Sequence, residues 1–196
     1  MQQEARAHTR QVMFETAQAR NDAERYREQA LRDPLTGLHN RRYVDDNLPA
    51  AVVLAAETRT PLTIALVDID HFKRINDTLS HDVGDDVLVA VADLLRSGQQ
   101  ALSETGFVAR MGGEEFLVVL PGVGAGVAGR LESLRRAVAL YPWEPVTGRL
   151  AVTVSIGATA TLGDQPVATL LADADRMLYA AKNAGRNRVV VRPSSR

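Results

Sequence analysis

Residues 106–120 read Gly-Phe-Val-Ala-Arg-Met-Gly-Gly-Glu-Glu-Phe-Leu-Val-Val-Leu, and this stretch decides the fold. Two β-prone runs flank Gly112-Gly113, which favours a tight hairpin because both glycines can take positive φ without a Cβ clash. The adjacent carboxylates of Glu114 and Glu115 follow directly. Two negative charges on one turn repel each other and are costly to keep ionised without a cation nearby. The stretch therefore indicates a hairpin that binds a metal or a polar ligand, although an ordinary charged hairpin tip has the same pattern.

The chain has 196 residues, which suits one globular domain with an appendage. Hydrophobic residues make up 45%, enough for a core, and the net charge of −1 gives no basic field that would favour nucleic acid or an anionic membrane. The absence of cysteine excludes disulfides and thiolate metal sites. No apolar run reaches the ~18 residues of a membrane span, and no signal-peptide pattern opens the chain. We expect no nucleic-acid partner, no membrane segment and a cytoplasmic location, whether alone or as the soluble output domain of a larger receptor.

Residues 1–32 contain no Gly or Pro and are rich in helix-forming residues. One heptad position is occupied by Ala5, Val12, Ala19 and Tyr26, and a second, four residues later, by Thr9, Thr16, Ala23 and Ala30. This spacing is that of a coiled-coil seam with small or polar side chains. We interpret residues 1–32 as an N-terminal signalling and dimerisation helix, a stalk that joins two copies of the chain into a homodimer. A solvated single helix is the alternative.

The remainder of the chain has the pattern of one α/β domain. The apolar run Leu62–Val67 is typical of a buried central strand, and it ends in Asp68-Ile69-Asp70, whose two carboxylates share one face of an extended chain. Further strands are predicted at 107–110, 116–120, 149–161 and 188–191. Helices are predicted at 41–59 (capped by Asn40), 71–77, 85–96 (opened by Gly84), 128–140 and 167–183, with 141–145 as a loop. The order predicts an α/β fold of the α+β type, with a mixed, partly antiparallel five-stranded sheet flanked by helices.

Three acidic side chains come from separate elements of this domain: Asp68 from the strand end, and Glu114 and Glu115 from the hairpin. If the hairpin pairs beside the strand, the carboxylates converge. Oxygen ligands without His or Cys suit Mg²⁺ or Mn²⁺, which keep substrate phosphates in their coordination sphere. Lys73 and the helix start at His71-Phe72 add groups for phosphate oxygens, and Asn76 and Asp85 have the chemistry to hold a base edge. The set predicts a nucleoside triphosphate site that supports phosphoryl transfer.

Six blocks of sequence, in this order, resemble the GGDEF family of diguanylate cyclases. They are Asp33–Arg42, Asp68–Asp77, His81–Asp85, Arg110–Phe116, Ser155–Gly157 and Ala174–Asn187. The resemblance implies that 33–196 is a GGDEF catalytic domain with the palm-like fold of nucleotide cyclases. It also implies a Mg²⁺-dependent reaction in which two GTP molecules give cyclic di-GMP and two pyrophosphates. Each domain of a dimer would hold one GTP.

The resemblance further implies roles for individual residues. The metal positions fall on Asp68, the carbonyl of Ile69, and Glu114. Glu114 and Glu115 would help to deprotonate the ribose 3′-hydroxyl, and Lys73 would neutralise phosphate charge. The implied substrate contacts are His71, Phe72, Asn76, His81, Asp85, Gly112, Gly113, Lys182 and Arg186, the last two lying four apart on one helical face. The intact acids favour an active enzyme over the alternative, an inactive GGDEF module that binds GTP or relays dimer geometry.

Two positions depart from the family's pattern. The Arg-x-x-Asp product-inhibition site of many members is replaced here by Ser103 and Gly106, so we expect no tight feedback site of that kind. Ser80 stands where a Gly is common.

Other residues have simpler interpretations. We interpret Asp70, Asp77 and Asp82 as capping or supporting groups, Arg110 as a support of the hairpin, His8 and His39 as surface residues, and Trp143 as a packing residue. The stretch Gly124–Gly129 matches Gly-x-Gly-x-x-Gly, and Glu144 follows about 20 residues later, as in dinucleotide-binding sites. Glu144 lies between prolines rather than at the end of a second parallel strand, so we regard this as the weaker hypothesis.

Overall fold

The computed structural model describes residues 18, 22, 25–123, 126–162 and 165–192, and the chain divides into two units, Met1–Arg32 and Asp33–Arg196. In the first unit residues 25–30 are helical, and Tyr26 is 71% exposed. The seam positions that lie outside the described residues are Ala5, Thr9, Val12, Thr16, Ala19 and Ala23. Among the residues that the structure does describe, no helix has both the length and the apolar character of a membrane span.

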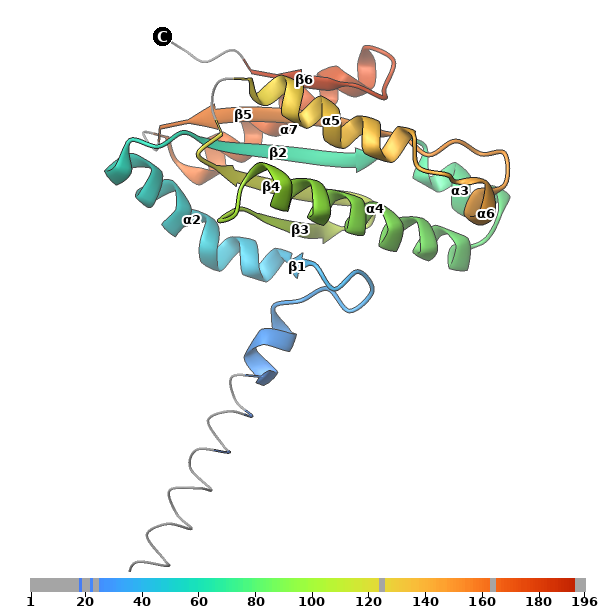
Figure 1. Cartoon of the computed structure of the whole chain (residues 1–196), viewed down its shortest axis with the longest axis horizontal. Coiled ribbons are helices and arrows are strands. Elements are labelled where there is room, and N and C mark those ends of the chain that lie inside the picture. The colour runs from blue at the N-terminus through green and yellow to red at the C-terminus, as the bar shows by residue number, and fades with distance from the viewer. Residues whose placement is uncertain (1–17, 19–21, 23–24, 124–125, 163–164, 193–196) are drawn as a thin grey trace, which may run out of the picture. The chain divides into compact units, whose positions relative to one another are not determined.

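A six-stranded mixed sheet forms the centre of the second unit (Figure 1). Its order is β1-β3-β4-β2-β5-β6, with β1 His39–Asn40, β2 Leu62–Ile69, β3 Phe107–Gly112, β4 Glu115–Pro121, β5 Val154–Thr161 and β6 Val189–Val191. The central strand β2 is antiparallel to both β4 and β5, whereas the edge strands β1 and β6 run parallel to β3 and β5. The predicted buried central strand and the predicted hairpin are both confirmed.

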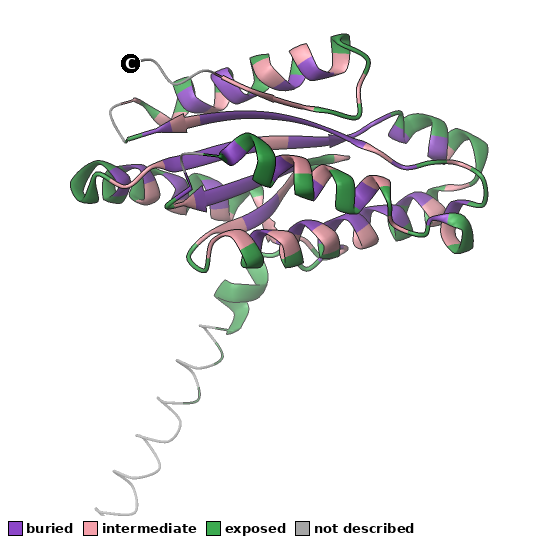
Figure 2. Cartoon of the chain, turned by 45° about the horizontal axis from the view of Figure 1, so that its top comes forward, coloured by how far each residue is buried: buried purple, intermediate pink, exposed green. Residues whose placement is uncertain are grey.

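Helices cover both faces of the sheet. They are α2 Arg41–Thr58, α3 Phe72–Thr78, α4 His81–Leu102, α5 Val127–Ala139, α6 Glu144–Thr147 and α7 Val167–Asn183. Alternation along β4 separates two cores: Phe116 and Val118 pack with residues of α4 and α5, whereas Leu117 and Val119 pack with residues of α2 and α7. Figure 2 shows the central strands buried between these two layers. The result is a three-layer domain whose rigid middle strand ends in Asp68 and Ile69.

The sixth strand, β1, was not predicted, because a strand of two residues carries no periodicity. It also changes the environment of His39. The His39 ring is half-buried, stacks on Tyr43 with ring centroids 3.5 Å apart, and meets the edge of Phe107 at 5.9 Å. The interpretation of His39 as a surface residue was therefore wrong.

Helix α4 begins at His81 rather than near Asp85, and it continues to Leu102 rather than ending near Arg96. Ser80 caps it, because the Ser80 hydroxyl accepts a hydrogen bond from Val83 N at 3.2 Å. Gly84 lies inside the helix, where a Cβ would clash with the side-chain oxygen of Asn76. The glycine thus permits close approach of α3 to α4 and does not mark a helix boundary.

Two boundaries near α6 also differ from the prediction. Glu144 and Pro145, the end of the predicted loop 141–145, belong to a short helix, which Pro145 permits because proline is tolerated in the first turn of a helix. Residues 149–153 precede β5 instead of belonging to it, since Leu150 N donates to Thr147 O at 3.3 Å and closes a turn there. Trp143 is 5% exposed and donates its indole N–H to Val138 O at 2.8 Å, which confirms its packing role.

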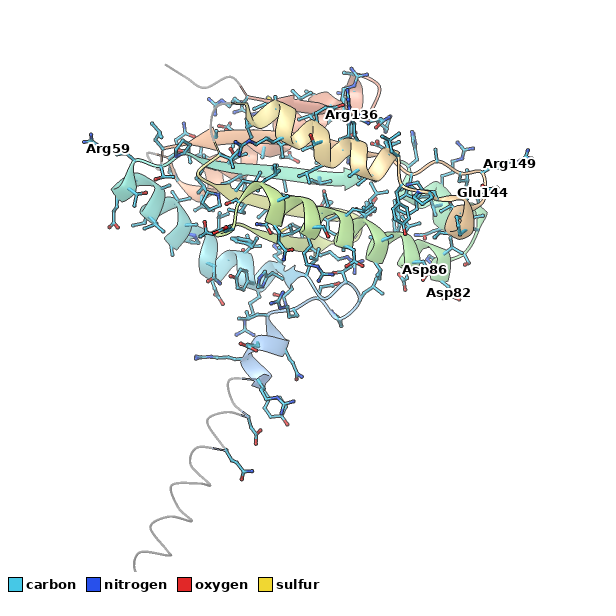
Figure 3. The ribbon with its side chains drawn as sticks, in the orientation of Figure 1. Arg59, Asp82, Asp86, Arg136, Glu144 and Arg149 are labelled. Carbon is cyan, nitrogen blue, oxygen red and sulfur yellow. The ribbon has the colours of Figure 1, made fainter. Side chains whose placement is uncertain are left out.

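The dinucleotide-binding hypothesis is contradicted by the topology. Residues 124 and 125 of the glycine-rich stretch lie outside the described residues, but the strand before it, β4, is antiparallel to β2. A dinucleotide site requires parallel strands joined by a crossover. Glu144 lies on α6 (Figure 3) and not at a strand end.

Candidate active site

Asp68 lies near the carboxyl end of β2, between two neighbouring strands. It is opposite Glu115 of β4 and Ser155 of β5, and only 6% of its surface is exposed. The next residue, Ile69, donates its backbone N–H to the carbonyl of Glu114 at 3.3 Å. The hairpin therefore lies against the end of the central strand. Acidic residues more than forty positions apart in sequence meet at one edge of the sheet, as the pairing of these strands required.

The hairpin turn contains Gly112, with φ of +143°, and Gly113, with φ of +53°. A Cβ at either position would meet no atom within 4 Å, so the backbone conformation and not the available space requires glycine. Arg110 supports the turn, because its Nε donates to Gly113 O at 2.9 Å. The predicted role of Arg110 is confirmed, and the guanidinium also anchors the hairpin to a second segment.

That second segment begins at Asp33. Arg110 Nη1 lies 3.2 Å from Asp33 Oδ1, and Asp33 also accepts hydrogen bonds from Thr36 N at 2.9 Å and Thr36 Oγ1 at 2.7 Å. Burial acts to raise the pKa of Asp33, but the hydrogen bonds from Thr36 and Arg110 outweigh it and hold that pKa below its usual value. Asp33 therefore remains ionised and keeps the hairpin tied to the start of the domain.

Burial and neighbouring charges together raise the pKa of Asp68. Burial is the largest influence and raises the pKa of Asp68, and the negative charges of Glu114 and Glu115 raise it further. Lys182, at the end of α7, acts in the opposite direction, because its Nζ lies 2.7 Å from Asp68 Oδ2. The pKa of Asp68 still stays above its ordinary value. One paired lysine does not compensate for the burial of this carboxylate next to two others.

The residues at this edge fit a hard divalent cation. Hard oxygen donors occur here in the carboxylates of Asp68 and Glu114 and in the backbone carbonyl of Ile69, and such an ion prefers oxygen ligands. Within the described ranges no group of three or more His, Asp or Glu side chains is arranged to chelate a metal. Carboxylates in this number suit Mg²⁺, because this ion usually binds one or two carboxylates together with substrate phosphates.

The predicted phosphate and base contacts on α3 and α4 follow directly in the chain. His71 and Lys73 are exposed, and His71 has a left-handed φ of +57°. Phe72 is 8% exposed and packs in the core, so only its backbone is available to a ligand. Asn76 Oδ1 is buried and has no hydrogen-bond partner in the described structure. Such an atom needs an explanation, and a ligand that donates an N–H is one.

His81 and Asp85 lie on the first turns of α4, with exposed side chains. Asp82, between them, also projects to solvent (Figure 3), where a negative charge suits the first turn of a helix. The exposed side chains of His71, Lys73, His81 and Asp85 are therefore accessible to a ligand.

The C-terminal end of α7 differs from the prediction. Arg186 does not share a helical face with Lys182, because α7 ends at Asn183 and Gly185, with φ of +111°, turns the chain. Arg186 itself has φ of +62° in that turn. The sequence reasoning also missed that Lys182 pairs directly with Asp68. The spacing of a lysine 114 positions away along the chain carries no signal of such a contact.

The sequence reasoning named Asp70 only as a supporting group. Asp70 is 4% exposed and accepts three hydrogen bonds, from Thr153 Oγ1 at 2.7 Å, Ser155 Oγ at 2.6 Å and Asn187 N at 2.9 Å. It caps no helix; instead it supports residues of β5 and of the turn after α7. The sequence signal for this role was the alternation of Asp68 and Asp70, which places both carboxylates on one face of an extended chain.

Comparison with known proteins identifies the family. The family model described as "Diguanylate cyclase, GGDEF domain" matches residues 30–188. The response regulator PleD of Caulobacter vibrioides is 44% identical over 176 residues, which cover 87% of this chain and 38% of PleD. The diguanylate cyclase DgcP of Pseudomonas aeruginosa is 44% identical over 167 residues, covering 84% of this chain and 24% of DgcP. The chain thus spans well under half of these relatives.

Solved structures agree with the sequence comparison. The coiled coil and GGDEF domain of DgcB from Caulobacter crescentus, solved in complex with c-di-GMP, matches with a TM-score of 0.85 and 34% identity over 95% of this chain and 98% of that one. The GGEEF domain of a diguanylate cyclase from Vibrio cholerae matches with a TM-score of 0.70 and 34% identity over 81% and 99%. The family-model match, the related sequences and the shared fold show that the chain belongs to the GGDEF-domain family of diguanylate cyclases.

Proposed function

We propose that this chain is a diguanylate cyclase that acts in the cytoplasm and condenses two GTP molecules into cyclic di-GMP and two pyrophosphates, with Mg²⁺ or Mn²⁺. The main observation that supports the proposal is that Asp68, near the end of β2, lies next to the hairpin that contains Glu114 and Glu115. The raised pKa of Asp68 supports it, because buried carboxylates that repel one another are stabilised by a cation. The related cyclases that share the fold support the choice of reaction.

The metal ligands in this proposal are the carboxylates of Asp68 and Glu114 and the carbonyl of Ile69. A divalent cation bound there neutralises phosphate charge and makes a nearby hydroxyl easier to deprotonate. Phosphoryl transfer otherwise requires mainly positioning. Lys73 and Arg186 are proposed to contact the triphosphate. Lys182, which holds Asp68 in this structure, would exchange that partner for phosphate oxygens when the metal and GTP bind.

The remaining contacts orient the nucleotide. Asn76, His81 and Asp85 are proposed to hold guanine and ribose, and the unpartnered Asn76 Oδ1 supports this assignment. The backbone of His71, Phe72, Gly112 and Gly113 is proposed to line the phosphates. Gly112 and Gly113 have no side chains, so a ligand can closely approach the backbone of the turn.

The chemical step joins two nucleotides. Glu114 or Glu115 accepts the proton of a ribose 3′-hydroxyl, and the resulting oxygen forms a bond with the α-phosphorus of the other GTP. The bond from that phosphorus to the bridging oxygen breaks, and pyrophosphate leaves. Two such steps close the ring. Because each domain holds one GTP, we propose a homodimer in which residues 1–32 raise the effective concentration of one domain near the other.

The direct test is incubation of the full chain with GTP and Mg²⁺, followed by identification of the product by mass spectrometry. We expect cyclic di-GMP from the wild type. Asp68→Asn and Glu115→Gln should lower turnover by about two orders of magnitude, the scale of losing one preorganised electrostatic contact. Asp93→Asn is the matched control, because Asp93 is an exposed carboxylate of α4 that pairs with Arg96 away from these residues. It should leave turnover unchanged.

The same experiment distinguishes the alternative. A dimeric wild-type sample that binds GTP but forms no cyclic dinucleotide would make the chain a GGDEF module that binds nucleotide or relays dimer geometry. Equal turnover in wild type and Asp68→Asn would remove Asp68 from the reaction.

A further inference from the structure

The turn that follows α7 has an uncommon backbone conformation. Three consecutive residues have positive φ: Gly185 at +111°, Arg186 at +62° and Asn187 at +48°. Residues other than glycine rarely adopt this region, and they persist in it only where surrounding contacts determine the conformation. Arg186 and Asn187 both adopt it, just after the helix that carries Lys182, so contacts with other segments must hold this turn.

Asp70 supplies one of those contacts. Its Oδ2 accepts the backbone N–H of Asn187 at 2.9 Å and the hydroxyl of Thr153 at 2.7 Å, and its Oδ1 accepts the hydroxyl of Ser155 at 2.6 Å. Because Asp70 is only 4% exposed, these donors replace water around the carboxylate. Hydrogen bonds to an ionised acceptor are stronger than those between neutral groups. The Asn187 bond is therefore a firm attachment of the turn.

A second contact holds the same residue from another element. Arg135 of α5 donates to the side-chain Oδ1 of Asn187, while Glu132 orients the Arg135 guanidinium through two hydrogen bonds of 2.8 Å. Asn187 is thus held through its backbone by Asp70, just after β2, and through its side chain by Arg135 of α5. The two attachments leave the turn little freedom to relax to an unstrained conformation.

The attachment lies next to the acidic edge. Asp70 is two residues after Asp68, and Asn187 is five residues after Lys182. The end of β2 and the end of α7 are therefore joined twice, by the ion pair of Lys182 with Asp68 and by the hydrogen bond of Asn187 with Asp70. Arg186 lies between these two joints, in the strained turn.

We propose that Asp70 is a positioning residue for nucleotide binding: through the Asn187 N–H it fixes the turn 185–187, and so sets the placement of Lys182 and Arg186 relative to the triphosphate. This inference rests on the proposed function. Asp70 is proposed to act through Asn187, because it is only 4% exposed and both of its oxygens already accept hydrogen bonds from protein donors. Loss of the attachment should weaken GTP binding more than it slows the chemical step.

The test must separate positioning from stability. Asp70→Asn keeps an acceptor for Asn187 N and Thr153, while Ser155 can turn its hydroxyl to accept from the new amide. The triple variant Asp70→Leu, Thr153→Val, Ser155→Ala removes the acceptor together with both hydroxyl donors, so that neither hydroxyl is left buried without a partner, which limits the loss of stability. Of the three donors to Asp70, only the Asn187 N–H then remains without its acceptor. Thr63→Val is the control, since it removes a buried hydroxyl bond of 2.6 Å to Val123 O at the far end of β2.

Binding is measured by calorimetry with 3′-deoxyguanosine triphosphate and Mg²⁺, because this analogue lacks the attacking hydroxyl, and KM and kcat are measured with GTP. We expect the triple variant to weaken analogue binding and raise KM by about tenfold, the loss expected for one hydrogen bond to a charged group, with a smaller change in kcat. Asp70→Asn and Thr63→Val should stay within about threefold of wild type in KM, less than the loss of one such bond.

Three outcomes would overturn the proposal: unchanged analogue binding in the triple variant, an equal loss in Thr63→Val, or a loss confined to kcat. If the triple variant does not fold, Asp70→Leu alone is compared with Asp70→Asn, and equal KM values in these two would also overturn it. Failure of the wild type to bind the analogue would instead contradict the proposed function, so the two failures are distinguishable.

Discussion

Replacement of Lys182 by Met tests the charge balance at the acidic edge. Methionine keeps most of the apolar stem of the side chain and removes the ammonium group that lies 2.7 Å from Asp68 Oδ2. Asp68 would then remain buried next to Glu114 and Glu115 without its paired cation. We expect the Lys182→Met variant to be less stable than the wild type at neutral pH.

The magnitude follows from the burial of the two partners. The Asp68 side chain is 9% exposed and that of Lys182 is 31% exposed. Breaking a fully buried pair costs about 3–5 kcal/mol, whereas exposed pairs contribute less than about 1 kcal/mol. Because Lys182 is partly exposed, we expect the loss of this ion pair to cost an intermediate amount of stability, about 1–3 kcal/mol, the range of a hydrogen bond to a charged group.

The pH dependence has a definite sign. The folded-state pKa of Asp68 is raised above the ordinary 3.8, and removal of Lys182 would raise it further. Below pH 3.8 the carboxyl is protonated in the folded and the unfolded chain, so the loss of Lys182 costs little there. The cost appears as pH rises through the folded-state pKa, so it should be larger at pH 7 than near pH 4. Millimolar Mg²⁺ should restore stability to the variant more than to the wild type, because it binds only the folded carboxylates.

The assay is urea unfolding of wild type and Lys182→Met at pH 7 and near pH 4, each with and without Mg²⁺. Lys73→Met is the matched control, because Lys73 is an exposed lysine of α3, and it should change the free energy of unfolding by less than about 0.5 kcal/mol. An equal cost of Lys182→Met at both pH values, or no cost at pH 7, would show that the ion pair does not offset the burial of Asp68.

Four further predictions follow from the same geometry. Asp33→Asn should lower the free energy of unfolding by about 1–2 kcal/mol at pH 7 in urea melts, and the difference should vanish as pH falls below 3.8, because the lowered pKa makes the ionised form the stabilising one. Gly84→Ala gains about 1 kcal/mol of helix propensity but displaces the Asn76 oxygen, so KM for GTP should rise while stability changes little; an unchanged KM would refute the placement of Asn76. Deletion of residues 1–32 should make initial rates depend on the square of protein concentration at low concentration, and linear rates would show that the stalk does not join the domains. Titration with cyclic di-GMP should give a Ki no lower than the KM for GTP, since Ser103 and Gly106 carry no charge; a far lower Ki would reveal a feedback site.

Much of the fold was predictable because its strongest elements have long, regular patterns. Leu62–Val67 is apolar except at Thr63 and forms most of the central strand, and the predicted helix at 167–183 has the observed bounds. The failures occurred where contacts override local pattern. Gly84 resembled a helix boundary but serves the approach of α3 to α4, and β1 is too short to carry a period. Tertiary packing decided both.

The acidic edge was predictable in outline, because a hairpin that pairs beside a central strand must bring its turn to the end of that strand. The register of Asp68 with Glu115 shows this meeting. The contacts of Lys182 and Asp70 were not predictable. Both depend on where α7 ends, and that end is set by the positive φ of Gly185 and by hydrogen bonds between residues more than a hundred positions apart.

The central claim is that Asp68 and Glu114 hold one divalent cation together with GTP. Titration of Mn²⁺ by electron paramagnetic resonance, in the presence of 3′-deoxyguanosine triphosphate, measures that cation directly. We predict that Asp68→Asn and Glu114→Gln each abolish most of the Mn²⁺ affinity and that the double variant loses little more, because both ligands serve the same ion. Independent, additive losses, or wild-type affinity in Asp68→Asn, would contradict a shared metal site.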